Sequence, residues 1–275
     1  MKFFLKRFLL PVIFFFTPPA GSNSITGEYE FYFRTAADLQ PGEDFTYVVS
    51  YSLLKLGEVR IKILEAKETE GAMTYRAAAY MDSYDNVPFA NLHQIYESTF
   101  SEDNRPVKFR GIVKGEEYTT FTDYEYNYEK SLIRVKKGKV KPYQLWTDST
   151  ASADKIYQDG LSILFYARMN FGDNRSIDIP CFVNEKKVNT KLNYYTDVTD
   201  VSIDAVDYAV ACLRLDGETD FVSVFGLTGY FQGWFSNDEA LIPIVAEMKV
   251  IIGNVKLELV KWNRKGWSPP EYNSE

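Results

Sequence analysis

Residues Asp159 to Asn170 read Asp-Gly-Leu-Ser-Ile-Leu-Phe-Tyr-Ala-Arg-Met-Asn, and they carry the one strong helix signal in a chain otherwise patterned as strands. Asp159 is a residue type that caps helix starts, and Gly172 follows the segment as a stop signal. The pattern therefore predicts a single helix over about residues 159–170.

Apolar residues cover nearly every face of this predicted helix. One face has the i, i+3, i+4, i+7 spacing and consists of Leu161, Leu164, Phe165 and Arg168. The remaining faces carry Ile163, Tyr166 and Met169. Because a helix that is hydrophobic nearly all round is a buried helix, we expect the β-sheet to wrap around it.

The chain on both sides of the helix alternates between apolar and polar residues, which is typical of strands with one face against a core. Phe45, Tyr47, Val49 and Tyr51 share one such face. Roughly a dozen short strands at about 8–12-residue spacing predict a mainly β, antiparallel barrel or sandwich. Residues 140–157 lack the alternation, so we expect no strand there.

The first 22 residues combine a basic start, a short apolar run and small residues, which is the pattern of a cleaved signal peptide. The apolar run is shorter than the roughly 20 residues of a membrane-spanning helix, so we expect an exported protein with no stable membrane span after cleavage. The remaining chain is predicted to comprise a lead-in at 23–43, a single β-rich domain at 44–262 and a flexible C-terminal tail at 263–275.

The formal net charge of −7 argues against nucleic acid as a partner, because basic patches supply most of that affinity. It argues equally against binding anionic membranes by charge alone. Cys181 and Cys212 could form a disulfide in an exported chain, or they could be inert buried thiols. Their spacing does not match a metal site.

Candidate catalytic and metal-binding groups are few. Gly160-Leu161-Ser162 begins like a nucleophile elbow, but Leu164 replaces the second glycine that the sharp turn needs. His93 is the sole histidine. Four acidic residues lack the spacing of a calcium loop: Asp197, Asp200, Asp204 and Asp207. We therefore predict no catalytic residue, no metal and no cofactor, with a carboxylate-based hydrolase kept as a third alternative.

Tyr124, Tyr126 and Tyr128 alternate with polar residues and share one face of a predicted strand. Such a row could stack sugar rings, which would suit a carbohydrate-binding or adhesion module. It could equally be cross-strand packing, since aromatic residues are enriched in strands.

Three short motifs resemble those of the exported bacterial proteins grouped as domain of unknown function 3108. They are Gly57-Glu58-Val59-Arg60-Ile61, Asp159 to Ser162 followed by Tyr166-Ala167-Arg168, and Trp234 to Asp238 followed by Pro243 and Gly253. The resemblance covers residues 44–262 and implies a lipoprotein-carrier-like fold, an incomplete antiparallel barrel curled around one helix. It further implies an envelope protein, with the periplasm as the expected location, and an apolar cavity. It supplies no catalytic residue.

The leading hypothesis is therefore a non-enzymatic exported protein that binds a lipid or another apolar ligand between sheet and helix. The side chains predicted to contact this ligand are Leu164, Phe165, Tyr166 and Met169 of the helix and Tyr47 and Tyr51 of the first regular strand. The competing interpretation is that these side chains fill the core and leave no cavity.

Overall fold

The computed structural model describes residues 38–273 except 70, 86, 88–90, 220, 222–227 and 250–253. This part of the chain contains fourteen strands and one helix, α1 (Ser162–Met169), which confirms the mainly β class. The predicted signal peptide at 1–22 and most of the lead-in at 23–43 lie outside the described residues.

The strands form one antiparallel sheet whose two halves flank the helix in sequence. The first half consists of β1 (Asp44–Tyr51), β2 (Leu54–Thr69), β3 (Ala72–Ser83), β4 (His93–Ser101), β5 (Pro106–Lys114), β6 (Thr119–Asn127), β7 (Leu132–Lys139) and β8 (Gln144–Ser152). The second half consists of β9 (Arg175–Val183), β10 (Lys186–Val201), β11 (Val210–Thr219), β12 (Gly229–Ser236), β13 (Pro243–Lys249) and β14 (Asn254–Asn263). Pairing of β1 with β14 joins the halves, and β8 and β9 are the two edges.

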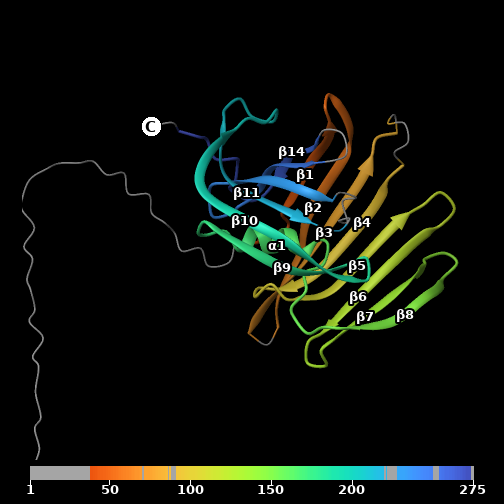
Figure 1. Ribbon diagram of the computed structural model, residues 1–275. Helices are drawn as coiled ribbons and strands as arrows, with labels where there is room; N and C mark the ends of the chain where they lie inside the picture. The colour runs from red at the N-terminus through yellow and green to blue at the C-terminus, as the bar shows by residue number, and fades with distance from the viewer. Residues whose placement is uncertain are drawn as a thin grey trace, which may run out of the picture. The chain divides into compact units, whose positions relative to one another are not determined.

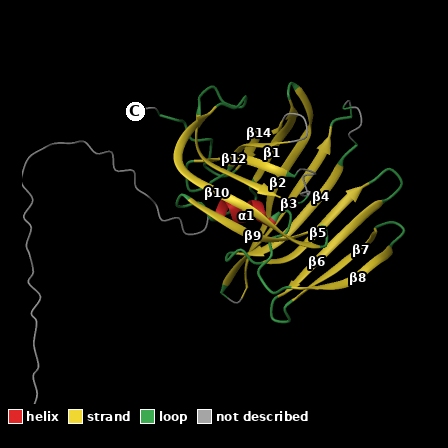
Figure 2. Ribbon diagram, in the orientation of Figure 1, coloured by secondary structure: helices red, strands yellow, loops and turns green. Residues whose placement is uncertain are grey.

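The sheet curls around α1 without closing, and the helix lies in its hollow (Figures 1 and 2). The segment before the helix covers the edge of β9: the Gln158 N–H donates to the Pro180 carbonyl at 2.8 Å, and the Phe182 N–H donates to the Gln158 carbonyl at 2.8 Å. These bonds satisfy backbone groups that an open sheet edge would otherwise expose. The expected incomplete barrel around one helix is thus confirmed.

Strand β8 occupies part of the region where the sequence pattern predicted no strand, so that prediction was wrong. Most β8 side chains are exposed, on both faces of the strand. A strand that is exposed on both faces does not need apolar residues at every second position. Its sequence therefore lacks the alternation by which strands are predicted.

The C-terminal segment, which the sequence predicted to be a flexible tail, packs against the sheet. The Trp267 ring packs edge-on against Phe45 at a centroid distance of 6.1 Å. The Tyr272 N–H donates to the Ala209 carbonyl at 2.7 Å, and Glu271 pairs with Val210 in a short bridge. A large aromatic side chain and backbone pairing hold residues 263–273 on the sheet, despite their proline-rich and polar composition.

Candidate functional site: an apolar cavity beside the helix

The start of α1 is fixed to β4 through the buried carboxyl group of Asp159. One carboxyl oxygen accepts the N–H groups of Leu161 and Ser162 at 2.8 and 2.7 Å, and the other accepts the Ser98 hydroxyl at 2.6 Å. Asp159 therefore caps the first turn, as its residue type suggested. Burial raises the pKa of Asp159 to about 6, and the hydrogen bonds oppose that rise.

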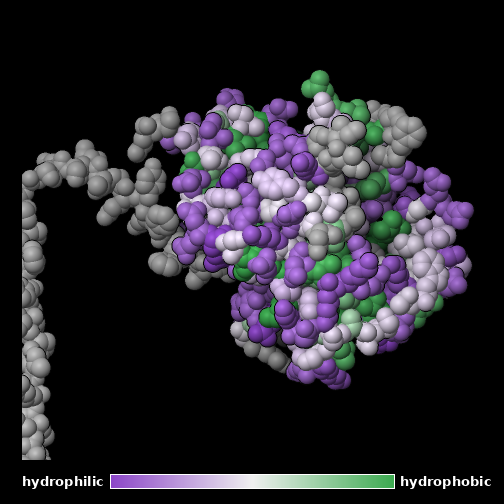
Figure 3. Space-filling model, in the orientation of Figure 1, coloured by the Kyte–Doolittle hydropathy of each residue, from purple (hydrophilic) through white to green (hydrophobic). Residues whose placement is uncertain are grey.

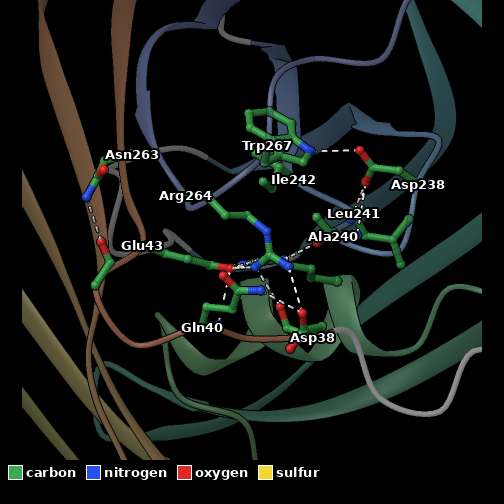
Figure 4. Close-up of polar contacts among 12 residues, drawn as sticks. Asp38, Gln40, Glu43, Asp238, Ala240, Leu241, Ile242, Asn263, Arg264 and Trp267 are labelled. Carbon is green, nitrogen blue, oxygen red and sulfur yellow. Dashed lines mark hydrogen bonds and ion pairs between the residues drawn. The ribbon is translucent and has the colours of Figure 1, made fainter.

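The other end of α1 is fixed by a buried ion-pair cluster. The Arg168 guanidinium donates to both carboxylate oxygens of Glu43, at 2.7 and 3.0 Å, and its Nε donates to the Ala240 carbonyl at 2.7 Å. Arg264 also pairs with Glu43, and it reaches Asp38 at 3.0 Å (Figure 4). The cluster ties the helix to the start of β1 and to the C-terminal segment, so the helix cannot shift without breaking charged bonds.

Between these anchors the helix presents different sides to the two halves of the sheet. Phe165 stacks on Phe100 of β4 with ring centroids 5.0 Å apart, which fills that side. On the other side, Ile163, Leu164 and Ala167 line a cavity of about 150 Å³. The facing wall comes from β9 to β13 and includes Val183, Leu192, Leu215, Phe231, Phe235 and Val245.

The cavity is closed at one end and leads to the surface at the other. Asp159 and Cys181 at the closed end are fully buried, whereas at the other end Phe221 and Met248 of the lining are half-buried and Thr228 is exposed. Gly233 is in the lining and adds no side chain to the space; a Cβ atom there would lie 3.2 Å from the ring of Phe235, which also lines the cavity. The arrangement can hold an apolar group in the interior while the rest of a ligand remains near the surface.

Among the six side chains predicted to contact a ligand, Leu164 lines this cavity. The other five are not in its lining: Phe165 and Met169 are buried, Tyr166 and Tyr51 are half-buried, and Tyr47 is buried with its hydroxyl donating to the Pro243 carbonyl at 3.0 Å. Pro243 itself lines the cavity, so Tyr47 supports the wall from outside the lining.

Sequence reasoning missed the strand wall of the cavity. The alternation of apolar and polar residues shows which side chains of β10 to β13 point to the interior. It does not show where these side chains leave the interior beside the helix unfilled. Glycines in strand interiors were the available signal, since they often mark places with no side chain to pack. Gly233 of β12 is such a position in the lining, whereas the Phe231 ring fills the space beside Gly217 of β11.

The tyrosine row of β6 faces the interior. Tyr124 and Tyr126 are buried, and Tyr128 is half-buried. Tyr124 stacks on Phe109 with centroids 5.2 Å apart, and Tyr126 stacks on Tyr128 at 6.1 Å. These rings pack within the core and do not form an exposed row for sugars.

The remaining candidate groups have structural surroundings. Cys181 and Cys212 are both buried thiols that are not joined in a disulfide, and burial raises the pKa of Cys212 to about 12. His93 starts β4, and its Nδ1 lies 2.7 Å from the Asp82 carboxylate. Within the described part of the chain, no group of three or more His, Cys, Asp or Glu residues could hold a metal ion.

Fold and cavity together define a class of protein: one antiparallel, β-barrel-like sheet that curls around a single helix and encloses an apolar space beside it. The chain belongs to the family of proteins of unknown function DUF3108, whose family model matches residues 46–260. No curated protein sequence matches it. None of the described helical segments is long and apolar enough to span a bilayer.

Two solved structures are similar to this chain. A β-barrel-like protein of domain of unknown function DUF1849 from Brucella abortus has 12% identity and a TM-score of 0.45, with 82% of this chain and 98% of that chain covered. A protein of YmcC-like fold from Bacteroides fragilis has 11% identity and a TM-score of 0.39, with 84% of this chain and 100% of that chain covered.

Proposed function

We propose that this protein is a non-enzymatic, exported binding protein that holds the apolar part of a lipid or similar amphiphile. The observation that carries the proposal is the apolar cavity between α1 and strands β9 to β13. Export to the periplasm is supported by the basic, apolar and small-residue pattern of residues 1–22.

The size of the cavity limits the ligand. A volume of about 150 Å³ is similar to that of an engineered apolar cavity that binds benzene in another protein. It therefore suits one short apolar group, such as the end of a single acyl chain, with the polar end directed toward the exposed Thr228. Each methylene transferred from water into such a space contributes about 0.8 kcal/mol.

Two variants of the same helix test this assignment. Leu164→Trp fills the cavity, whereas Tyr166→Trp places the same ring at another half-buried position that is not in the lining. We expect Leu164→Trp to lower the affinity for saturated fatty acids at least tenfold and Tyr166→Trp to change it less than twofold. Circular dichroism checks that both variants fold.

Solvent extraction followed by mass spectrometry identifies any ligand that copurifies with the protein. Isothermal titration with fatty acids of increasing chain length then measures affinity. Protein that is reproducibly empty and gives no heat with any fatty acid would rule the proposal out, as would equal losses in the two tryptophan variants.

A further inference from the structure

The strand connections on one side of the sheet carry most of the exposed apolar surface. Because successive strands alternate in direction, every second connection lies at the same end of the meander. Tyr51 pairs with Leu54 beside the β1–β2 turn, Lys114 with Thr119 beside the β5–β6 turn, and Lys139 with Gln144 beside the β7–β8 turn. In Figure 1 the β1–β2 tip lies at the top of the view and the β5–β6 and β7–β8 tips lie at the right; we call this common end of the strands the tip face.

Nine of the eleven large apolar side chains that are exposed in the described residues belong to this end of the strands. The main ones are Leu53, Leu54, Tyr118, Tyr143, Leu145 and Trp146. Leu53 is 100% exposed, and Figure 3 shows apolar atoms projecting at the tip of its hairpin. The two exceptions, Val107 and Ile156, lie outside the tip face. Such a concentration of exposed apolar side chains marks an interaction surface.

The same end of the strands holds the open end of the cavity. Phe231 of the cavity wall pairs with Met248, Met248 with Val255, and Val255 with Tyr51, which pairs with Leu54. One continuous row of neighbouring residues therefore links the cavity lining to the exposed leucines of the β1–β2 hairpin. A ligand that leaves the cavity beside Thr228 emerges at the same end of the strands as the tip face.

One hairpin of the tip face is basic. Its tip, residues 139–146, contains Lys139 and Lys141 and no acidic residue, whereas Glu116 and Glu117 lie in the β5–β6 turn and Lys137 is paired with Glu185. Lys139 lies over the Tyr118 ring with its Nζ 4.7 Å from the centroid, and Tyr118 contacts Trp146 edge-on at 5.8 Å. Tyrosine and tryptophan with nearby lysines are the side chains that favour the lipid–water interface, and lysines attract anionic headgroups.

We propose that the tip face docks the protein onto a phospholipid surface that contains anionic lipids. Leu53 and Leu54 enter the interface first, Tyr143, Leu145 and Trp146 add aromatic and apolar contacts, and the lysines of the β7–β8 hairpin bind headgroups. The proposal does not require a ligand in the cavity, so it can fail or succeed independently of the proposed function.

The test is co-sedimentation of the full chain with vesicles of phosphatidylcholine, with and without phosphatidylglycerol. The first variant is Leu53→Ser with Leu54→Ser, because these side chains are 100% and 51% exposed. The second is Tyr143→Ser with Trp146→Ser. The matched control is Val107→Ser with Ile156→Ser, whose side chains are 39% and 41% exposed outside the tip face. Residues 1–37 are common to all variants, so differences between variants report on the tip face.

We expect each tip-face variant to lower the vesicle partition coefficient at least tenfold, and the control to change it less than twofold. Lys139→Gln with Lys141→Gln should remove the advantage of phosphatidylglycerol vesicles and the salt dependence that accompanies it. The proposal is overturned if the unaltered protein sediments with neither vesicle or if the control loses as much binding as the tip-face variants. Loss of a dimer, rather than of vesicle binding, in the leucine variant would also overturn it and assign the surface to a second copy of the chain.

Discussion

Arg168 in the helix and Glu43 at the start of β1 form a bidentate ion pair, although 125 residues separate them in sequence. Their side chains are 3% and 1% exposed, and Arg264 from the C-terminal segment joins the same carboxylate. The pair fixes the distance between the helix and the first half of the sheet, and therefore the space left on the opposite side of the helix.

Breaking this pair should destabilise the fold far more than breaking a similar pair at the surface. We expect Arg168→Met to lower the free energy of unfolding by about 3 kcal/mol, because a buried charge loses a partner. The control is Arg60→Met, which removes a bidentate ion pair with Asp44 at the surface. The Arg60 side chain is 51% exposed, so we expect this substitution to lower the free energy of unfolding by less than about 1 kcal/mol. Urea unfolding measures both, and equal losses would contradict the role assigned to the buried pair.

The C-terminal segment should contribute to stability. Trp267→Ala removes ring contacts with Phe45 and Trp262 and a 2.7 Å hydrogen bond from Nε1 to Asp238. We expect a loss of about 2–4 kcal/mol. Trp146→Ala, at a ring that is 44% exposed, is the control and should cost less than about 1 kcal/mol. A melting temperature unchanged by Trp267→Ala would show that this segment is not held as described.

Stability should depend on pH through Asp159. Its pKa is raised from 3.8 to about 6 in the folded protein, so the folded state holds the proton more tightly than the unfolded state. The stabilisation from this group is complete below about pH 4 and is lost as pH rises through 6, by about 3 kcal/mol in total. Asp159→Asn keeps an acceptor for the helix N–H groups but does not ionise. Between pH 4 and pH 8 the free energy of unfolding should fall more steeply for the unaltered protein than for Asp159→Asn. Parallel curves for the two proteins would show that the pKa of Asp159 is not raised by folding.

Two strand glycines should respond differently to alanine. At Gly217 a Cβ atom would lie 2.1 Å from the Lys191 carbonyl oxygen, so the backbone must move, and we expect a loss of about 2–3 kcal/mol. At Gly233 the nearest atom would be a ring carbon of Phe235 at 3.2 Å, a close contact that a small ring movement relieves, so we expect a smaller loss than at Gly217. The added methyl group occupies cavity space, and titration should show weaker fatty-acid binding in Gly233→Ala although the protein remains folded. Tighter binding would mean that the ligand lies elsewhere.

The two thiols should be unreactive in the folded protein. Both are 0% exposed, and burial raises the pKa of Cys212 to about 12, so little thiolate forms near neutral pH. Intact mass spectrometry after iodoacetamide treatment should show no adduct without denaturant and two adducts in guanidinium. A mass two hydrogens lower, with no adduct under either condition, would instead show a disulfide between Cys181 and Cys212.

The residue pattern was sufficient to predict the fold class and the position of the helix. Alternating residues such as Phe45 and Tyr47 can bury one face only in a sheet, and the all-round apolar pattern of residues 159–170 requires a buried helix. Asp159 as the cap also followed from residue type and position, because capping is a local interaction. Strand β8 was missed because an edge strand has no buried face to produce a pattern.

Which side of the helix is packed and which side faces a cavity follows from the three-dimensional arrangement of the strands. Leu164 and Phe165 are adjacent in sequence and similar in hydrophobicity, yet Phe165 meets Phe100 while Leu164 faces the cavity. That difference depends on the volumes of side chains from distant strands, including the missing side chain at Gly233. It depends equally on the Glu43–Arg168 pair, which holds the helix in place. A cavity remains where side chains from strands far apart in sequence do not fill the available volume, and no local sequence pattern shows this. A cavity could therefore be expected, but its lining residues could not be predicted.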